Sequence, residues 1–171
     1  MELKTARLLM RPLNINDLAS THEYTGDVES IPYMLYFPAL SIDETRDFLA
    51  RSTAEWAKPS PAFYEFAIEL DQRNIGEVGV YLDPSRSEGE LGWLIHRDFR
   101  GNGYVSEAAE AVKYFSISIL QLKRLYACCD ARNLASRRIM EKLGMKLELS
   151  NGTRVNRDGN EAVEFVYSLL V

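Results

Sequence analysis

One segment limits the fold more than any other, because a strand-like run, a glycine pair and an amphipathic helix follow one another directly. Residues 90–95 read ELGWLI, residues 100–104 read RGNGY, and apolar residues recur at helical spacing over 105–120. Gly101 and Gly103 are therefore expected at the amino end of a helix, where free N–H groups and the helix dipole favour an anion. Because glycine lacks a Cβ, a phosphate group can approach this backbone closely.

The rest of the chain predicts one domain, residues 1–171, because no repeat, linker or low-complexity tract divides it. Alternation and turn signals predict strands over residues 6–11, 63–70, 75–82, 90–95, 124–131, 145–150 and 162–170. Helical spacing and capping residues predict helices over residues 16–26, 42–58, 105–120 and 134–143, with an irregular segment over 31–40. This order predicts an α/β (α+β) fold with a mixed sheet.

Composition and charge limit the class of protein and its partners. Hydrophobic residues make up 46% of the chain and charged residues 26%, which is typical of a folded protein. No apolar run approaches the ~18–20 residues that span a bilayer, and the amino end lacks a signal-peptide pattern. A net charge of -5 disfavours nucleic acid and favours a cationic partner. We therefore expect a cytoplasmic protein with no membrane or nucleic-acid partner.

The cysteines and histidines predict neither a disulfide nor a metal site. Cys128 and Cys129 are adjacent, so on a strand their side chains point to opposite faces. His22 and His96 are the two histidines of the chain and are the two side chains that could join them as soft ligands. No metal is expected.

The glycine pair alone is a weak signal, and it is also compatible with a simple turn. A dinucleotide-binding loop needs a third glycine where Ser106 stands and lies after the first strand of its fold. A P-loop needs a Gly-Lys-Ser/Thr sequence, which this loop lacks.

A second motif follows the predicted strand 124–131 and reads DARNLASRRIMEKLGM over residues 130–145. Asn133 stands at a strand-to-helix junction, and Ser136 lies three residues later in the first helical turn. Helix capping alone would explain this pattern, and a capping role is compatible with a functional one.

Together the two motifs resemble the RimJ/RimL-like branch of the GNAT superfamily of N-acetyltransferases. RGNGYVSEA resembles the CoA loop of that branch, and Asn-x-x-Ser-x-x-x-x-Glu-Lys-Leu-Gly resembles its second cofactor motif. TARLLMRPL, residues 5–13, is similar to its first strand. The resemblance spans nearly the whole chain. It implies the GNAT acyltransferase fold, a mixed central sheet of about six to seven strands with helices on both faces.

The resemblance also implies acetyl-CoA as the donor and assigns its binding residues. The backbone of residues 93–96 would pair with pantetheine amides, beside a strand that splays away. The glycine loop would hold the pyrophosphate, and the second motif would lie near the pantetheine arm and the sulfur. The implied cofactor-binding residues are Trp93, Leu94, Ile95, His96, Arg100, Gly101, Asn102, Gly103, Tyr104, Val105, Ser106, Asn133 and Ser136.

Two catalytic residues are carried over from the resemblance. Some relatives use a tyrosine as the acid where this chain has Met140, so Ser136, which RimL-like members share, is the expected proton donor. Glu90 matches a carboxylate that activates the amine in some relatives, although a solvated strand glutamate is an equally good interpretation. Glu161 is a weaker candidate, and His96 is expected to pack or to contact pantetheine.

The loop departs from the wider superfamily at Asp98, where Gln or Arg is common. Because backbone amides do most of the anion binding, CoA affinity is expected to survive, with Arg97 and Arg100 supplying compensating charge.

The acceptor is expected to be an amine. Tyr33, Met34, Tyr36 and Phe37 are candidates for the walls of its site, although core packing is the more frequent role of such residues. A protein α-amine has a pKa near 8 against about 10.4 for lysine, which favours the N-terminus of a protein such as a ribosomal protein. The alternatives are a small-molecule amine, such as an aminoglycoside or a polyamine, and a CoA-binding sensor without catalysis. The family also allows a homodimer.

Overall fold

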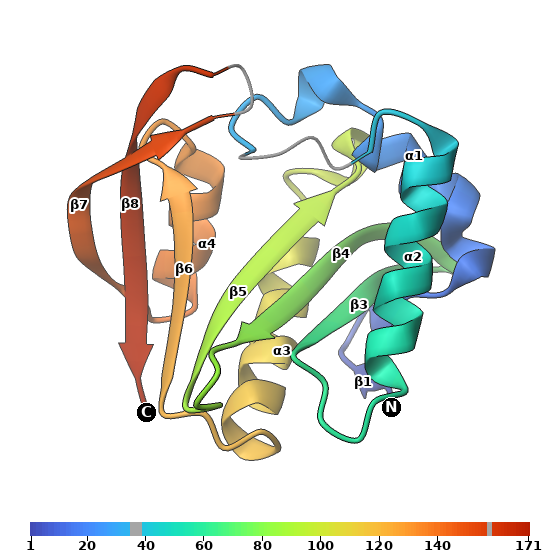
Figure 1. Ribbon diagram of the computed structural model, residues 1–171, viewed down its shortest axis with the longest axis horizontal. Coiled ribbons are helices and arrows are strands. Elements are labelled where there is room, and N and C mark those ends of the chain that lie inside the picture. The colour runs from blue at the N-terminus through green and yellow to red at the C-terminus, as the bar shows by residue number, and fades with distance from the viewer. Residues whose placement is uncertain (35–38, 157–158) are drawn as a thin grey trace.

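The computed structural model describes residues 1–34, 39–156 and 159–171, which form one mixed sheet with helices on both faces (Figure 1). The strands are β1 (Leu3–Lys4), β2 (Leu9–Pro12), β3 (Phe63–Leu70), β4 (Arg73–Leu82), β5 (Glu88–Ile95), β6 (Arg124–Asp130), β7 (Lys146–Val155) and β8 (Glu161–Leu170). Their order in the sheet is β1-β2-β3-β4-β5-β6-β8-β7. Within the described ranges β5 and β6 are the parallel pair, and all other neighbours are antiparallel.

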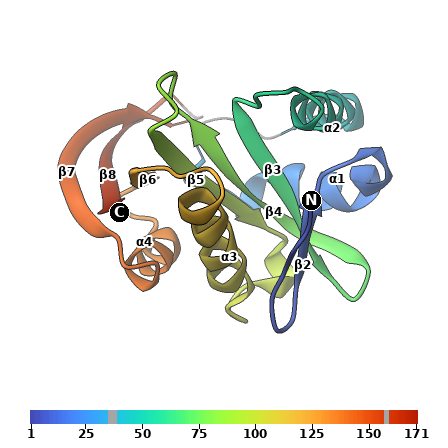
Figure 2. The same cartoon turned by 90° about the horizontal axis from the view of Figure 1, so that it is seen from below.

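The helices lie in two layers, with α1 and α2 against one face of the sheet and α3 and α4 against the other (Figure 2). They are α1 (Leu18–Thr25), α2 (Ile42–Trp56), α3 (Tyr104–Ser118) and α4 (Leu134–Lys142). Short 3-10 turns, η1 (Ile15–Asp17), η2 (Val28–Ser30) and η3 (Arg97–Phe99), connect the larger elements. The predicted mixed sheet with helices on both faces is confirmed.

The sheet has one strand more than the upper end of the predicted range, since the amino-terminal segment forms a hairpin. The predicted strand 6–11 lies at Leu9–Pro12, and the two-residue strand β1 pairs with its start. Two residues are too few to show an alternating pattern, so the sequence did not predict β1. The strand β7 runs to Val155 rather than ending at residue 150, because irregularities between Leu147 and Gly152 interrupt its alternation.

The capping residues decide where the first two helices begin. The Asn14 side chain accepts a hydrogen bond from the Asn16 N–H at 3.0 Å, and η1 therefore precedes α1 instead of one helix over 16–26. The predicted capping box of Ser41 and Glu44 opens α2. The helix predicted over residues 105–120 ends at Ser118, and Ile119 just beyond it is 59% exposed.

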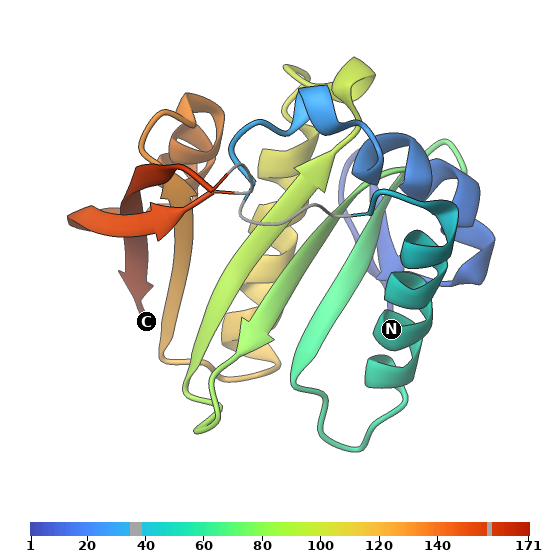
Figure 3. The same cartoon turned by 45° about the horizontal axis from the view of Figure 1, so that its top comes forward.

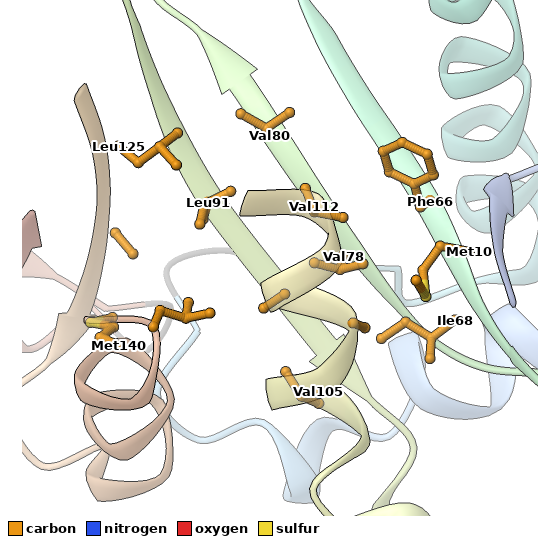
Figure 4. Close-up of a cluster of buried hydrophobic side chains, with 14 of the residues drawn as sticks. Met10, Phe66, Ile68, Val78, Val80, Leu91, Val105, Val112, Leu125 and Met140 are labelled. Atoms are coloured by element: carbon orange, nitrogen blue, oxygen red, sulfur yellow. The ribbon is translucent and has the colours of Figure 1, made fainter. Parts of the chain in front are cut away.

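The main core lies between α3 and the sheet (Figure 4). Val112 and Phe115 of α3 pack on Phe66 of β3 and Val78 of β4, and all four are at most 1% exposed. Because neighbouring strand residues point to opposite faces, the residues adjacent to this core face α1 and α2. On β3, β4 and β5 that second face carries carboxylates, which lie where the candidate site forms.

Candidate active site

The site forms where two parallel strands separate. Ladder pairs join β5 and β6 from Glu88–Arg124 to Glu90–Tyr126, and beyond Glu90 the strands diverge (Figures 1 and 3). Two cavities, of about 440 and 340 Å³, meet at this opening. Residues of both cavity walls are Tyr33, Met34, Trp93, Leu94, Asn133 and Ser136. The two cavities therefore adjoin at the opening between β5 and β6.

The first cavity, which we call the donor cavity, is floored by the glycine loop. Gly101 and Gly103 have φ values of 80° and 81°, in the left-handed region that disfavours residues with a Cβ. A Cβ added at Gly101 would meet no atom within 4 Å, so this backbone faces open space. The helix α3 begins at Tyr104, immediately after the loop. Its free N–H groups and dipole make this end of the cavity suited to an anion.

The amino-terminal hairpin of β1 and β2 holds the glycine loop and the start of α3 through hydrogen bonds. Arg7 donates through Nη1 to the Asn102 carbonyl at 3.0 Å and through Nε to the Glu107 carboxylate at 2.7 Å. Thr5 Oγ1 also donates to Glu107, at 2.6 Å. Glu107 therefore links the start of α3 to the amino-terminal hairpin.

The cations of the donor cavity come from α4 as well as from the loop. Arg100 lines the cavity, whereas Arg97 forms an ion pair with Asp27 and does not supply the expected compensation. Arg138 and Lys142 line the cavity and were not predicted. Their four-residue spacing, which places both on one helical face, was an available signal.

Most of the predicted cofactor-binding residues line the donor cavity. They are Trp93, Leu94, Ile95, Arg100, Gly101, Gly103, Tyr104, Val105, Ser106, Asn133 and Ser136. Two predicted residues, His96 and Asn102, are not among the described residues that line this cavity. The His96 side chain caps η3, accepting from the Asp98 N–H at 3.2 Å, and Asn102 Nδ2 donates to the carbonyls of Phe99 and Arg100. Their predicted contacts with the cofactor stay predictions.

The junction between the cavities is ordered by hydrogen bonds among the second-motif residues. Asn133 Oδ1 accepts from the Ser136 N–H at 3.1 Å, so Asn133 caps α4 as its position allows. Trp93 Nε1 donates to Ser136 Oγ at 3.3 Å. Ser136 Oγ therefore keeps its own hydrogen for another acceptor. Met140, where some relatives carry a tyrosine, is fully buried in the main core and lines neither cavity.

The second cavity, which we call the acceptor cavity, is lined by carboxylates. Glu90, the predicted base, lies in its wall, whereas Glu161 is exposed and lines neither cavity. Burial and the charge of Glu164 raise the pKa of Glu90, and a hydrogen bond with Cys128 and the charge of Arg154 lower it, with a net upward shift. Because Glu90 lines the cavity, its carboxylate can be reached by an amine that enters it.

Two further carboxylates of this cavity, Glu65 and Glu77, were not predicted. Glu65 is 3% exposed, and its carboxylate lies over Gly79, where a Cβ would come within 2.6 Å of Oε2. Tyr24 Oη donates to Glu77 Oε2 at 3.2 Å. Burial raises the pKa of Glu77 to about 7, and burial together with the charge of Glu77 raises that of Glu65. The alternation of residues 63–70 puts Glu65 and its neighbour Phe66 on opposite faces of the sheet. This alternation was the sequence signal that could have identified Glu65.

The predicted acceptor walls are partly described. Tyr33 and Met34 line both cavities, in the segment after η2 that crosses the end of the sheet (Figure 3). Tyr36 and Phe37 lie outside the described residues. Within the described ranges no helix is long and apolar enough to cross a membrane, and no group of three or more His, Cys, Asp or Glu side chains is placed to hold a metal ion.

Comparison with known proteins gives a consistent family match. The model of the acetyltransferase (GNAT) domain matches residues 7–146. The uncharacterized N-acetyltransferase YnaD of Bacillus subtilis (strain 168) is 28% identical over 150 residues, covering 86% of this chain and 84% of the relative. Spermidine N(1)-acetyltransferase of Escherichia coli (strain K12) is 24% identical over 140 residues, covering 81% and 73%.

A solved structure agrees with the fold over the whole chain. The RimL ribosomal L7/L12 alpha-N-protein acetyltransferase in complex with coenzyme A superposes with a TM-score of 0.89, covering 100% of this chain and 98% of the other. At 14% identity, this likeness concerns the fold alone.

Proposed function

The chain belongs to the GNAT acetyltransferase family, and from this premise we propose that it transfers the acetyl group of acetyl-CoA directly to a primary amine of a cationic acceptor. The observation that carries the proposal is the meeting of two chemically different cavities at Trp93, Asn133 and Ser136. The donor cavity is lined by the glycine loop and by arginine and lysine side chains, and the acceptor cavity is lined by three glutamates. A negatively charged donor and a positively charged acceptor would therefore approach from opposite sides.

The donor cavity fits CoA in both charge and backbone geometry. The open backbone at Gly101 leaves room for a pyrophosphate at the start of α3, and Arg138 and Lys142 add positive charge along α4. Beyond its ladder with β6, the edge of β5 from Leu91 to Ile95 has no strand partner among the described residues and can pair with the amides of pantetheine, with Arg100 Nη2 3.5 Å from the Ile95 carbonyl. Asn133 stands beside this edge.

Acetyl-CoA supplies a thioester, in which the C–S bond breaks as the amine nitrogen bonds to the acetyl carbon. The amine loses one proton, and the departing sulfur gains one. Ser136 is suited to give that proton, because Trp93 Nε1 already donates to its oxygen and leaves its hydrogen free. Glu90 is suited to accept the amine proton, because its raised pKa makes it a stronger base than an exposed glutamate.

The acceptor cavity supports a cationic amine over a neutral or acidic one. Glu65, Glu77 and Glu90 line it, and an amine arrives mostly as an ammonium ion at neutral pH. A protein N-terminal amine, predicted from the sequence, needs the least help to deprotonate. A small polyamine is a second candidate, because acidic side chains surround the cavity and the relative from Escherichia coli is a spermidine acetyltransferase.

Release of free thiol from acetyl-CoA tests the proposal. We expect thiol release in the presence of a primary amine, with acetylated amine formed in equal amount. A panel of monoamines, polyamines and N-terminal peptides covers the acceptor classes. Tight CoA binding without thiol release above the buffer rate, for every amine, would instead support the sensor interpretation.

A further inference from the structure

Glu65 and Glu77 form a carboxylate pair with which no cation of the described residues is paired. They are diagonal neighbours on one face of the sheet, since Glu65 pairs with Gly79 and Glu77 with Ala67 in the ladder of β3 and β4. Glu65 is only 3% exposed and lines the acceptor cavity. Its carboxylate accepts no hydrogen bond from any described residue. No lysine or arginine of the described chain pairs with either group.

Two neighbouring buried carboxylates without a counter-charge are costly, so the surroundings that keep them in place are informative. Gly79 leaves the space that the Glu65 carboxylate occupies, because a Cβ there would lie 2.6 Å from Oε2. Tyr24 holds Glu77 with a 3.2 Å hydrogen bond, and Asn74 Nδ2 in turn donates to Tyr24 Oη at 3.3 Å. The chain thus positions the pair from α1, β3 and β4 together.

Near Glu90 and Glu164, the acceptor cavity also contains a cation, Arg154. Arg154 lies in its wall, is 8% exposed, and has Nη1 3.6 Å from the Glu164 carboxylate. Its charge also lowers the pKa of Glu90. Within the described chain, this cation therefore lies near Glu164 and Glu90, and no cation is paired with Glu65 or Glu77.

We propose that the acceptor is an aliphatic amine with a second ammonium group, which binds to the Glu65–Glu77 pair while the reacting amine meets the thioester beside Trp93 and Ser136. This inference rests on the proposed function. It adds a binding site for the part of the acceptor that does not react. A protein N-terminal amine without a second cation would leave the pair unoccupied.

The sheet sets the scale of such an acceptor. Glu77 of β4 lies opposite Leu94 of β5, and the opening between β5 and β6 follows on the far side of β5. Neighbouring strands are ~4.8 Å apart, so Glu77 lies about one strand spacing and Glu65 about two, ~5–10 Å, from β5, whose far edge borders the opening. A short aliphatic chain between two amines covers this distance.

Matched diamines and monoamines test the site. We expect putrescine and cadaverine to be acetylated with a kcat/KM about tenfold or more above butylamine and pentylamine, because a charge-assisted contact is made by the diamines alone. Glu65→Gln and Glu77→Gln should each remove most of this advantage, so that the ratio of diamine to monoamine kcat/KM falls toward one. Gly79→Ala, which displaces the Glu65 carboxylate, should act in the same direction. Glu110→Gln, on the exposed side of α3, is the matched control and should keep the full advantage.

Binding separates failure of this site from failure of the transfer reaction. Calorimetry of putrescine with the CoA complex involves no acetyl group, so it reports the pair even when no thiol is released. Tighter binding of putrescine than butylamine, lost in Glu77→Gln, supports the site. Equal binding of the two amines would overturn the site, as would a diamine-to-monoamine kcat/KM ratio that is unchanged in both Gln variants. So would a preference for an N-terminal peptide whose acetylation is the same in the wild type and in both variants.

Discussion

Replacing Gly101 with alanine examines the donor cavity with the smallest possible change. Gly101 has a φ of 80°, and the added Cβ would meet no protein atom within 4 Å. The cost to the fold is therefore limited to the left-handed backbone, about 1–2 kcal/mol. The new methyl group would project into the space assigned to the pyrophosphate.

The expected loss of affinity follows from the contacts that the methyl group would prevent. A hydrogen bond from a backbone amide to a charged oxygen contributes ~1.5–3 kcal/mol, so losing one raises the Kd for CoA by about 10- to 100-fold. Calorimetric titration of CoA into the folded variant measures this directly. Thermal unfolding of the same sample shows that the protein remains folded.

Gly144→Ala is the control for backbone strain. Gly144 also has a φ of 80°, and a Cβ there also meets nothing within 4 Å, but it follows α4 and lines neither cavity. Both variants should lose similar stability, and Gly144→Ala should keep its CoA affinity. An unchanged Kd in folded Gly101→Ala, or an equal loss in Gly144→Ala, would refute the placement of the pyrophosphate.

Three further predictions concern the junction and the carboxylates. Ser136→Ala should lower kcat about 10- to 100-fold with near-normal acetyl-CoA affinity, because the backbone N–H that Asn133 caps remains; unaltered turnover would remove Ser136 as the acid. Glu90→Gln should lower kcat/KM most where Glu90 is ionised and the amine is still protonated, that is, above the raised pKa of Glu90 and below the pKa of the amine, and a variant with the wild-type pH–rate profile would exclude Glu90 as the base. Burial raises the pKa of Glu77 from 4.5 to about 7, so the folded state holds a proton that the unfolded chain has released in this range. The free energy of unfolding should therefore fall as pH rises from about 5 to about 8, and denaturant unfolding should show a shallower fall for Glu77→Gln. An identical slope in that variant would mean that Glu77 is not protonated in the folded protein.

Local signals predicted the positions of the glycine loop and of the helix that follows it. Gly101, Gly103 and Ser106 follow one another in sequence, so their meeting at the start of α3 needed only a strand, a loop and a helix. Asn133 and Ser136 are also local to one helix start. Their approach to the glycine loop came from the family resemblance, since no spacing in a single sequence specifies a contact between α4 and β5.

The acceptor side depends on the sheet, and the sequence predicted less of it. Glu65 and Glu77 are each ordinary strand residues in sequence, and their pairing depends on the register of β3 and β4. The burial that raises their pKa values depends on packing of Tyr24 and α1 over the sheet. Arg97, expected to offset Asp98, instead meets Asp27, a residue far from it in the chain.

The central claim is that CoA bound at Gly101 and Gly103 delivers an acetyl group to an amine in the acidic cavity. Simultaneous measurement of free thiol and acetylated product, with acetyl-CoA and an amine panel, tests it most directly. The account predicts equal amounts of both, a rate that saturates with the amine, and a strong reduction in Gly101→Ala at low acetyl-CoA. Thiol release that is independent of every amine, or CoA binding with no acetylated product at all, would contradict it.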